Sequence, residues 1–153
     1  MNKSHLRIPL FVCLFLLAGL LTPIPAFAVQ TITVNDIAMG IVGEDEFEAG
    51  YALLQNHSVS WESDTGWSIT VRSLDADLGL GGGGLYTKLL SDLQWKLSSE
   101  SVWIPMTQND TEVDWSIDTG SGVVYIDIRV LLDWVNDEPG SYGADLLFTI
   151  APL

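Results

Sequence analysis

The side chains of this sequence that could do chemistry are mostly carboxylates, which gather in short clusters. The chain has 20 Asp and Glu residues against 6 Lys and Arg. Calcium binds the carboxylate and carbonyl oxygens of acidic loops, so clusters with alternating acids are candidate Ca²⁺ sites. The candidate ligands are Asp75 and Asp77, together with Asp110, Glu112 and Asp114. The alternative is that these acids only form a solvated surface, and the sequence indicates no other cofactor.

The same carboxylates give weak support for catalysis. Glycosidase chemistry needs two carboxylates in a cleft that raises the pKa of one of them, and no pattern in the sequence marks such a cleft. A Ser-His-Asp arrangement would depend on His57 alone after the first 28 residues, and no nucleophile-elbow sequence lies near it. We therefore predict a protein that is not an enzyme, with His57 in a surface loop.

Tryptophan is the other unusual component, with six in the chain. Trp67 and Trp115 alternate in phase with aliphatic neighbours, which predicts core positions for both. Trp103 precedes Ile104-Pro105, and Trp134 follows an acid near an acidic turn. Exposed tryptophans beside acids suit sugar rings, so Trp103 and Trp134 are the candidate ligand-binding residues. The alternative is that most of the tryptophans fill the space between two sheets.

Net charge excludes one class of function. A formal charge of −14 opposes phosphate backbones, whose binding requires Lys and Arg to release counterions. Nucleic-acid binding is therefore not expected. One Cys and two His also leave too few ligands for a zinc site of the usual types.

Residues 1–28 have the pattern of a cleaved signal peptide. Lys3 and Arg7 precede an apolar stretch at 10–21, and Ala26-Phe27-Ala28 is a small-x-small cleavage site. Cleavage would leave a chain without cysteine and without a membrane span. We therefore predict a secreted protein that is extracellular or lies at the cell surface.

Period-two alternation dominates residues 29–153, which we interpret as a single domain. Short alternating stretches separated by Gly, Asp, Asn and Pro turns predict an all-β fold, an antiparallel Ig-like β-sandwich. A four-residue leucine spacing adds a short helix near 86–90. The predicted strands are 30–34, 67–71, 93–97, 113–117, 123–132 and 146–150.

Two stretches resemble known bacterial surface domains. Gly66-Trp67-Ser68-Ile69-Thr70-Val71, followed by Leu93-Gln94-Trp95-Lys96-Leu97, resembles the middle of WxL-type cell-surface domains. The sequence from Pro139 to Ile150 is similar to the closing hairpin of secreted bacterial sandwiches, including pilin-like ones. The Trp-x-Leu motif lies mid-chain here, and no second one ends the chain. The resemblance implies an exported, non-catalytic surface module.

Two functions from different classes follow from these observations. The first is a structural or adhesive module whose partners are other surface proteins, with self-assembly through the terminal strands 30–34 and 146–150, because an unpaired edge invites strand addition. The alternative is a carbohydrate-binding module that holds a polysaccharide through exposed tryptophans and acids.

Overall fold

The computed structural model describes residues 28–35, 37, 42–80 and 86–153. The predicted signal peptide falls almost wholly outside them. The described chain is mostly β-strand, and its sheets are antiparallel, which confirms the all-β prediction. Within the described ranges, no helix has the length and apolar character needed to cross a membrane.

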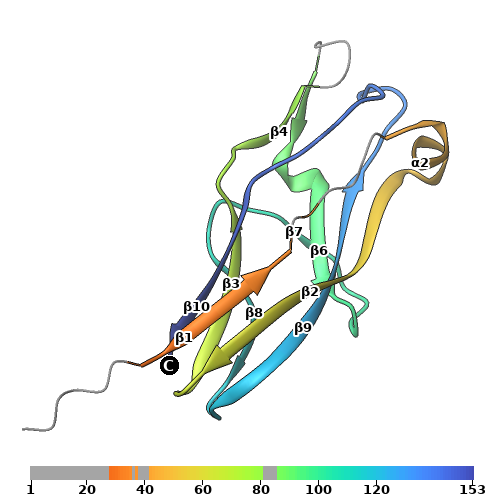
Figure 1. The fold of residues 1–153 in the computed structure, drawn as a ribbon. Helices are drawn as coiled ribbons and strands as arrows, with labels where there is room; N and C mark the ends of the chain where they lie inside the picture. Colours follow the sequence, from red (N-terminus) through yellow and green to blue (C-terminus); the bar gives the residue numbers. More distant parts are fainter. Residues whose placement is uncertain (1–27, 36, 38–41, 81–85) are drawn as a thin grey trace, which may run out of the picture.

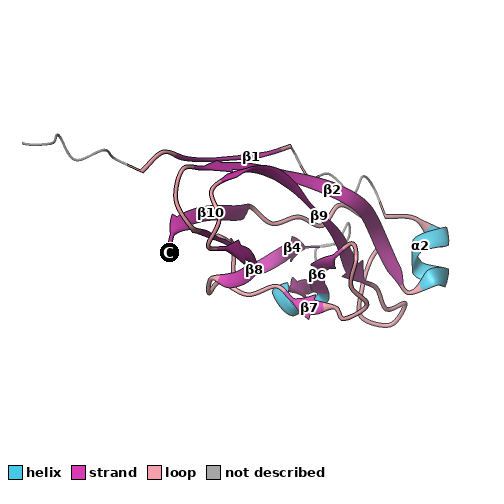
Figure 2. Ribbon diagram, turned by 90° about the horizontal axis from the view of Figure 1, so that it is seen from below, coloured by secondary structure: helices cyan, strands magenta, loops and turns pink. Residues whose placement is uncertain are grey.

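Two sheets form the layers of the fold, as Figures 1 and 2 show. The five-stranded sheet has the order β1-β2-β9-β6-β7, with β1 (Gln30–Val34), β2 (Tyr51–Ser63), β9 (Gly120–Leu131), β6 (Leu93–Leu97) and β7 (Ile104–Pro105). The three-stranded sheet has the order β10-β3-β8, with β10 (Leu146–Pro152), β3 (Trp67–Ser73) and β8 (Thr111–Ser116). A separate ribbon pairs β4 (Asp77–Leu80) with β5 (Thr87–Leu89).

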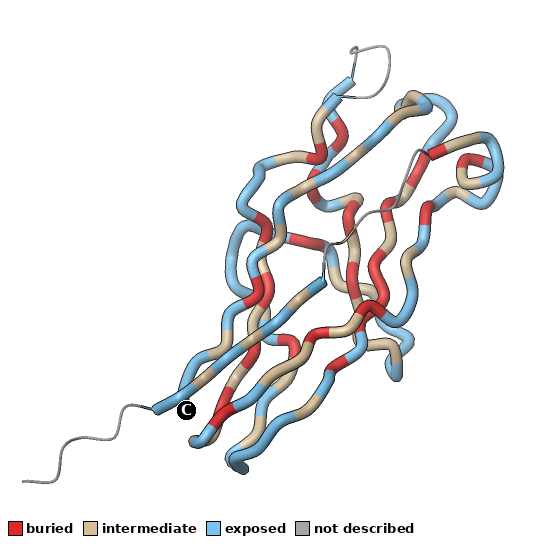
Figure 3. The backbone as a smooth tube through the Cα atoms, in the orientation of Figure 1, coloured by how far each residue is buried: buried red, intermediate tan, exposed pale blue. Residues whose placement is uncertain are grey.

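The core lies between the sheets because alternate side chains of each strand point inward. On β3, every second residue from Trp67 to Ser73 is buried, and Val124, Ile126 and Ile128 on β9 face it from the other sheet. Figure 3 shows such buried positions on strands of both layers. Period-two alternation therefore identified the inward face of these strands correctly.

One end of the core is filled by two tryptophans and requires a glycine beside them. The Trp61 and Trp67 ring centroids are 4.0 Å apart. Gly122 pairs with Trp61 across the sheet, and a Cβ at Gly122 would lie 3.0 Å from Cζ2 of that ring. A side chain at position 122 would therefore require the Trp61 ring to shift.

We therefore expect Gly122→Ala to lower the free energy of unfolding by about 1–3 kcal/mol, because the added methyl overpacks the Trp61 ring. Urea denaturation followed by tryptophan fluorescence measures this. Gly143→Ala is the matched control, since a Cβ there has no atom within 4 Å among the described residues. Equal stabilities of the two variants would contradict the role of Gly122.

The helix predicted near 86–90 is wrong. Residues 87–89 form strand β5, and the 3₁₀ turn η1 (Leu90–Asp92) follows. Lys88 is buried while Thr87 and Leu89 are exposed, so this stretch has strand periodicity. The four-residue leucine spacing therefore does not mark one buried face, since Leu89 is exposed on β5 and Leu93 is buried on β6.

The α-helix of the described chain is α2 (Glu44–Ala49), inside an acidic run that the sequence suggested was solvated surface. The Glu46 carboxylate accepts a hydrogen bond from the Gly43 N–H at 2.9 Å. Gly50 ends the helix in the left-handed region, with φ of 77°. Acids in the first turn favour the helix because its N-terminus carries partial positive charge.

Candidate functional site

Of the first two candidate calcium ligands, Asp75 lies in the connection between β3 and β4 and Asp77 is the first residue of β4; both accept main-chain hydrogen bonds. Asp75 Oδ2 accepts from the Asp145 N–H at 2.7 Å, and Asp77 Oδ1 accepts from the Gly79 N–H at 2.9 Å. The first of these bonds ties the start of β10 to the end of β3. Both carboxylates therefore have a role in organising turns.

The other three candidates lie at or just before β8, and the strand separates them. Asp110 Oδ1 is 3.6 Å from the Arg72 guanidinium Nε. Glu112 is exposed beside Thr70, whereas Asp114 is partly buried and accepts a hydrogen bond from the Trp115 N–H at 2.9 Å. Across the described ranges, no three His, Cys, Asp or Glu side chains gather closely enough to hold a metal ion. Calcium binding stays a prediction from the sequence.

Trp103 packs on the two cations of the outer face of the five-stranded sheet. The Arg129 guanidinium carbon lies 4.2 Å from its ring centroid, and Lys96 Nζ lies 5.3 Å from it. Such contacts contribute about 0.5–2 kcal/mol each, depending on desolvation. Arg129 also donates to Gln94 Oε1 at 2.9 and 2.7 Å. A cation therefore lies over the Trp103 ring, and sugar binding by Trp103 stays a prediction from the sequence.

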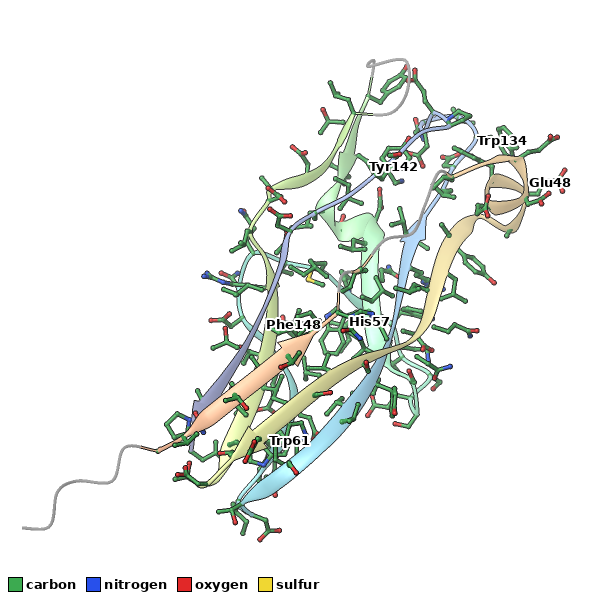
Figure 4. The ribbon with its side chains drawn as sticks, in the orientation of Figure 1. Glu48, His57, Trp61, Trp134, Tyr142 and Phe148 are labelled. Atoms are coloured by element: carbon green, nitrogen blue, oxygen red, sulfur yellow. The ribbon has the colours of Figure 1, made fainter. Side chains whose placement is uncertain are left out.

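Trp134 lies elsewhere, in the connection between β9 and β10. Its ring centroid is 4.7 Å from that of Phe47, which is buried on α2. Figure 4 shows Trp134 beside this helix. The Trp134 side chain thus packs against α2, and it remains 56% exposed to solvent. The two tryptophans chosen from the sequence thus have separate neighbours.

Trp115 is the aromatic residue whose placement the sequence predicted wrongly. Strict alternation with Val113 put it in the core, but it is 55% exposed. A β-bulge explains the difference: Thr70 pairs with Glu112 and Ile69 with Asp114, so Val113 is one extra residue in β8. Without the bulge, Trp115 would lie opposite the buried Trp67, where Ser116 lies instead. The bulge turns Trp115 to the outer face.

The neighbours of Trp115 on that outer face are short. Ser68 on β3 pairs directly with Trp115, and Ala151 on β10 pairs with Ser68. The next row holds Thr70 and Thr149, which also pair with each other. The core lies on the opposite side of these strands, since Trp67, Ile69, Val71 and Phe148 are buried. On this part of the outer face, the Trp115 ring is therefore surrounded by small side chains that end in hydroxyl or methyl groups.

Four strands end the two sheets, and they differ in how well they resist pairing with another chain. Strand β7 has only two residues, and β8 carries two acids and the bulge. Strands β1 and β10 contain no charged residue and no bulge. These two strands lie side by side at the same side of the molecule (Figure 1). Short length, charge and bulges are the usual protections of an edge, and β1 and β10 lack them.

His57 is buried on β2, not exposed in a loop as the sequence suggested. Its Nε2 atom is buried and has no hydrogen-bond partner among the residues that the structure describes. His57 pairs with the buried Ile126 on β9, and it alternates with the buried Val59 on β2. The histidine is thus part of the interior between the sheets.

Comparison of the chain with protein-family models, curated proteins and solved structures finds no match. The similarity to WxL-type and pilin-like surface domains therefore stays an expectation that rests on the residues quoted for it.

Proposed function

We propose that this protein is a secreted, non-catalytic structural or adhesive module of the extracellular space or cell surface, which assembles with a second copy of itself through strand β10. The observation that carries the proposal is the edge position of β10, whose seven residues carry no charge and include a proline only at the last position, Pro152. Main-chain N–H and C=O groups along such an edge can extend the sheet with a strand from another chain.

Charge favours β10 over the β8 edge of the same sheet. The protein is strongly acidic, so two copies repel each other unless they meet along an uncharged line. The Leu146–Pro152 segment provides that line, whereas Glu112 and Asp114 place negative charge on the β8 edge. Antiparallel pairing of β10 with its counterpart is self-complementary, as a two-fold dimer requires. It would join two three-stranded sheets into one of six strands.

The oligomeric state in solution tests this proposal. We expect a concentration-dependent dimer by size-exclusion chromatography with light scattering, and a larger dimer fraction at high salt because salt screens the repulsion between copies. We expect Thr149→Lys to shift the protein to monomer, because the two-fold places the new charges near each other. Thr149 is exposed on β10, so the variant should keep its fold.

Thr33→Lys on β1 is the matched control, since Thr33 is exposed on the other uncharged edge. It should leave the dimer intact. A wild-type protein that stays monomeric at high concentration and high salt, with β1 and β10 both protected from hydrogen exchange, would overturn the proposal. Loss of the dimer in Thr33→Lys, with Thr149→Lys still dimeric, would assign the contact to β1 instead.

A further inference from the structure

The bulge in β8 gives Trp115 a position that core packing does not require. Trp61 and Trp67 already fill this end of the core, and the extra residue Val113 sends the next tryptophan outward. β-Bulges often serve to redirect a side chain next to a functional site. A tryptophan that is 55% exposed leaves much apolar ring surface in water.

We propose that Trp115 is the stacking platform of a binding site for a neutral polysaccharide on the outer face of the three-stranded sheet. The apolar C–H face of a sugar ring would lie on the indole, and sugar hydroxyls would exchange hydrogen bonds with neighbouring side chains. This moves the site that the sequence placed at Trp103 and Trp134 to a residue that the sequence assigned to the core.

The neighbours of Trp115 have the chemistry that sugar hydroxyls need. Ser68, Thr70 and Thr149 carry hydroxyls that both donate and accept, and the exposed carboxylate of Glu112 accepts. Ser68, Thr70, Thr149 and Ala151 have short side chains. The Trp115 ring therefore projects beyond these neighbours on the surface of the sheet. An extended chain of sugars can therefore lie across the strands beside Trp115.

Charge selects a neutral ligand. Arg72 is the cationic residue on the outward positions of β3, and its guanidinium already lies 3.6 Å from the Asp110 carboxylate. An acidic polysaccharide would meet Glu112 and a protein with a formal charge of −14. A neutral glycan avoids this repulsion.

Affinity electrophoresis tests the site. The full protein is run in native gels that contain hydroxyethylcellulose, xylan or dextran, with alginate as the polyanionic comparison. We expect at least one neutral polymer to retard the protein and alginate not to do so. Trp115→Ala should weaken the retarding interaction about tenfold, because it removes the stacking surface, whereas Trp115→Tyr should keep most of it.

Trp134→Ala is the matched control, because its ring is exposed to nearly the same extent, 56%, on another part of the molecule. It should leave the retardation unchanged. Thr70→Ala should weaken binding less than Trp115→Ala does. The proposal fails if no neutral polymer retards the wild type, if only alginate does, or if Trp134→Ala has the same effect as Trp115→Ala.

This site is independent of the proposed assembly. Pairing through the β10 edge leaves the outward side chains of β3 and β8 uncovered. Polysaccharide binding should therefore be the same at protein concentrations where the wild type is monomeric and where it is dimeric, and Trp115→Ala should still dimerise. Failure of one proposal can thus be distinguished from failure of the other.

Discussion

Replacing Lys88 with methionine is expected to lower the free energy of unfolding by about 3–5 kcal/mol, because a buried carboxylate would lose its counter-charge. Lys88 Nζ lies 2.7 Å from Asp137 Oδ2 and 3.0 Å from Asp92 Oδ2. The Lys88 and Asp137 side chains are only 4% and 7% exposed. Water therefore cannot replace the ammonium group when it is removed.

Loss of this ion pair would affect more than one element, because its two residues lie in different parts of the fold. Lys88 belongs to β5, and Asp137 belongs to the connection between β9 and β10. Asp137 Oδ2 also accepts the Asp133 N–H at 2.8 Å, so the same carboxylate organises the turn. The pair thus joins the small β4–β5 ribbon to the rest of the molecule.

Urea denaturation at neutral pH measures the effect. A second variant, Lys88→Met with Asp137→Leu, should recover part of the lost stability, since replacing both charges with apolar groups removes the unpaired carboxylate. A change below about 0.5 kcal/mol in Lys88→Met would show that the pair is solvated, because exposed pairs contribute little. Comparison of the single and double variants therefore separates two losses of unfolding free energy: the one from an unpaired buried carboxylate and the one from lost packing.

The sequence predicted what local alternation controls and failed where distant segments meet. β1 and β6 match the predicted strands 30–34 and 93–97 residue for residue, because each strand shows its inward face in its own sequence. Asp137 lies in one of the Gly, Asp, Asn and Pro turns that the sequence predicts, where an acid is ordinarily solvated. Its burial depends on Lys88, which is 49 positions away in the chain, and nothing local indicates it.

Bulges account for the main errors. The strand β2 was missed because Gln55-Asn56-His57-Ser58 has a polar, loop-like composition. In the structure, the pairing register of β2 with β9 shifts between Leu54 and His57. Asn56 adopts a φ of 55°, and the strand continues beyond it. Trp115 was misplaced by the second bulge. A bulge is decided by pairing with a partner strand, so a single strand's sequence does not show it.

The α2 helix is a different case, because its signals were local. Glu46 three residues after Gly43, and Gly50 just after the last helical residue, are the ordinary start and stop pattern of a short helix. The acids of this stretch were interpreted by their charge, and the helix start and stop signals among them were not recognised. The two proposed binding surfaces differ similarly: the terminal edge strands were predicted from the sequence, but the outward Trp115 required the three-dimensional register.

Replacing Asp127 with asparagine is expected to lower the free energy of unfolding by about 3 kcal/mol at neutral pH. Asp127 Oδ2 lies 2.6 Å from Lys96 Nζ, and Oδ1 accepts hydrogen bonds from Ser98 Oγ at 2.7 Å and the Asn56 N–H at 3.0 Å. Both charged side chains are largely buried. The substitution leaves the Lys96 ammonium without its carboxylate, beneath the Trp103 ring.

The loss of unfolding free energy in Asp127→Asn should decrease as the pH falls. Burial alone would raise the pKa of Asp127, but hydrogen bonds from Lys96, Asn56 and Ser98 and the Lys96 charge outweigh burial and lower it below the usual 3.8. A depressed pKa in the folded state stabilises the protein fully above the unfolded-state pKa, and this stability is lost as pH falls through the folded-state pKa. The stability difference between wild type and Asp127→Asn should therefore be largest near neutral pH and shrink below about pH 4.

Urea titrations of both proteins from neutral pH to about pH 3 measure this difference directly. The pKa of Asp133 is also lowered, by hydrogen bonds from the Val135 N–H and the Asn136 amide, but Asp133 is present in both proteins and its contribution cancels. A stability difference that stays constant over the whole range would mean that the Asp127 charge is not what stabilises the fold. Shrinkage on acidification, matched by Lys96→Met, would identify the ion pair under Trp103 as the acid-sensitive element of the five-stranded sheet.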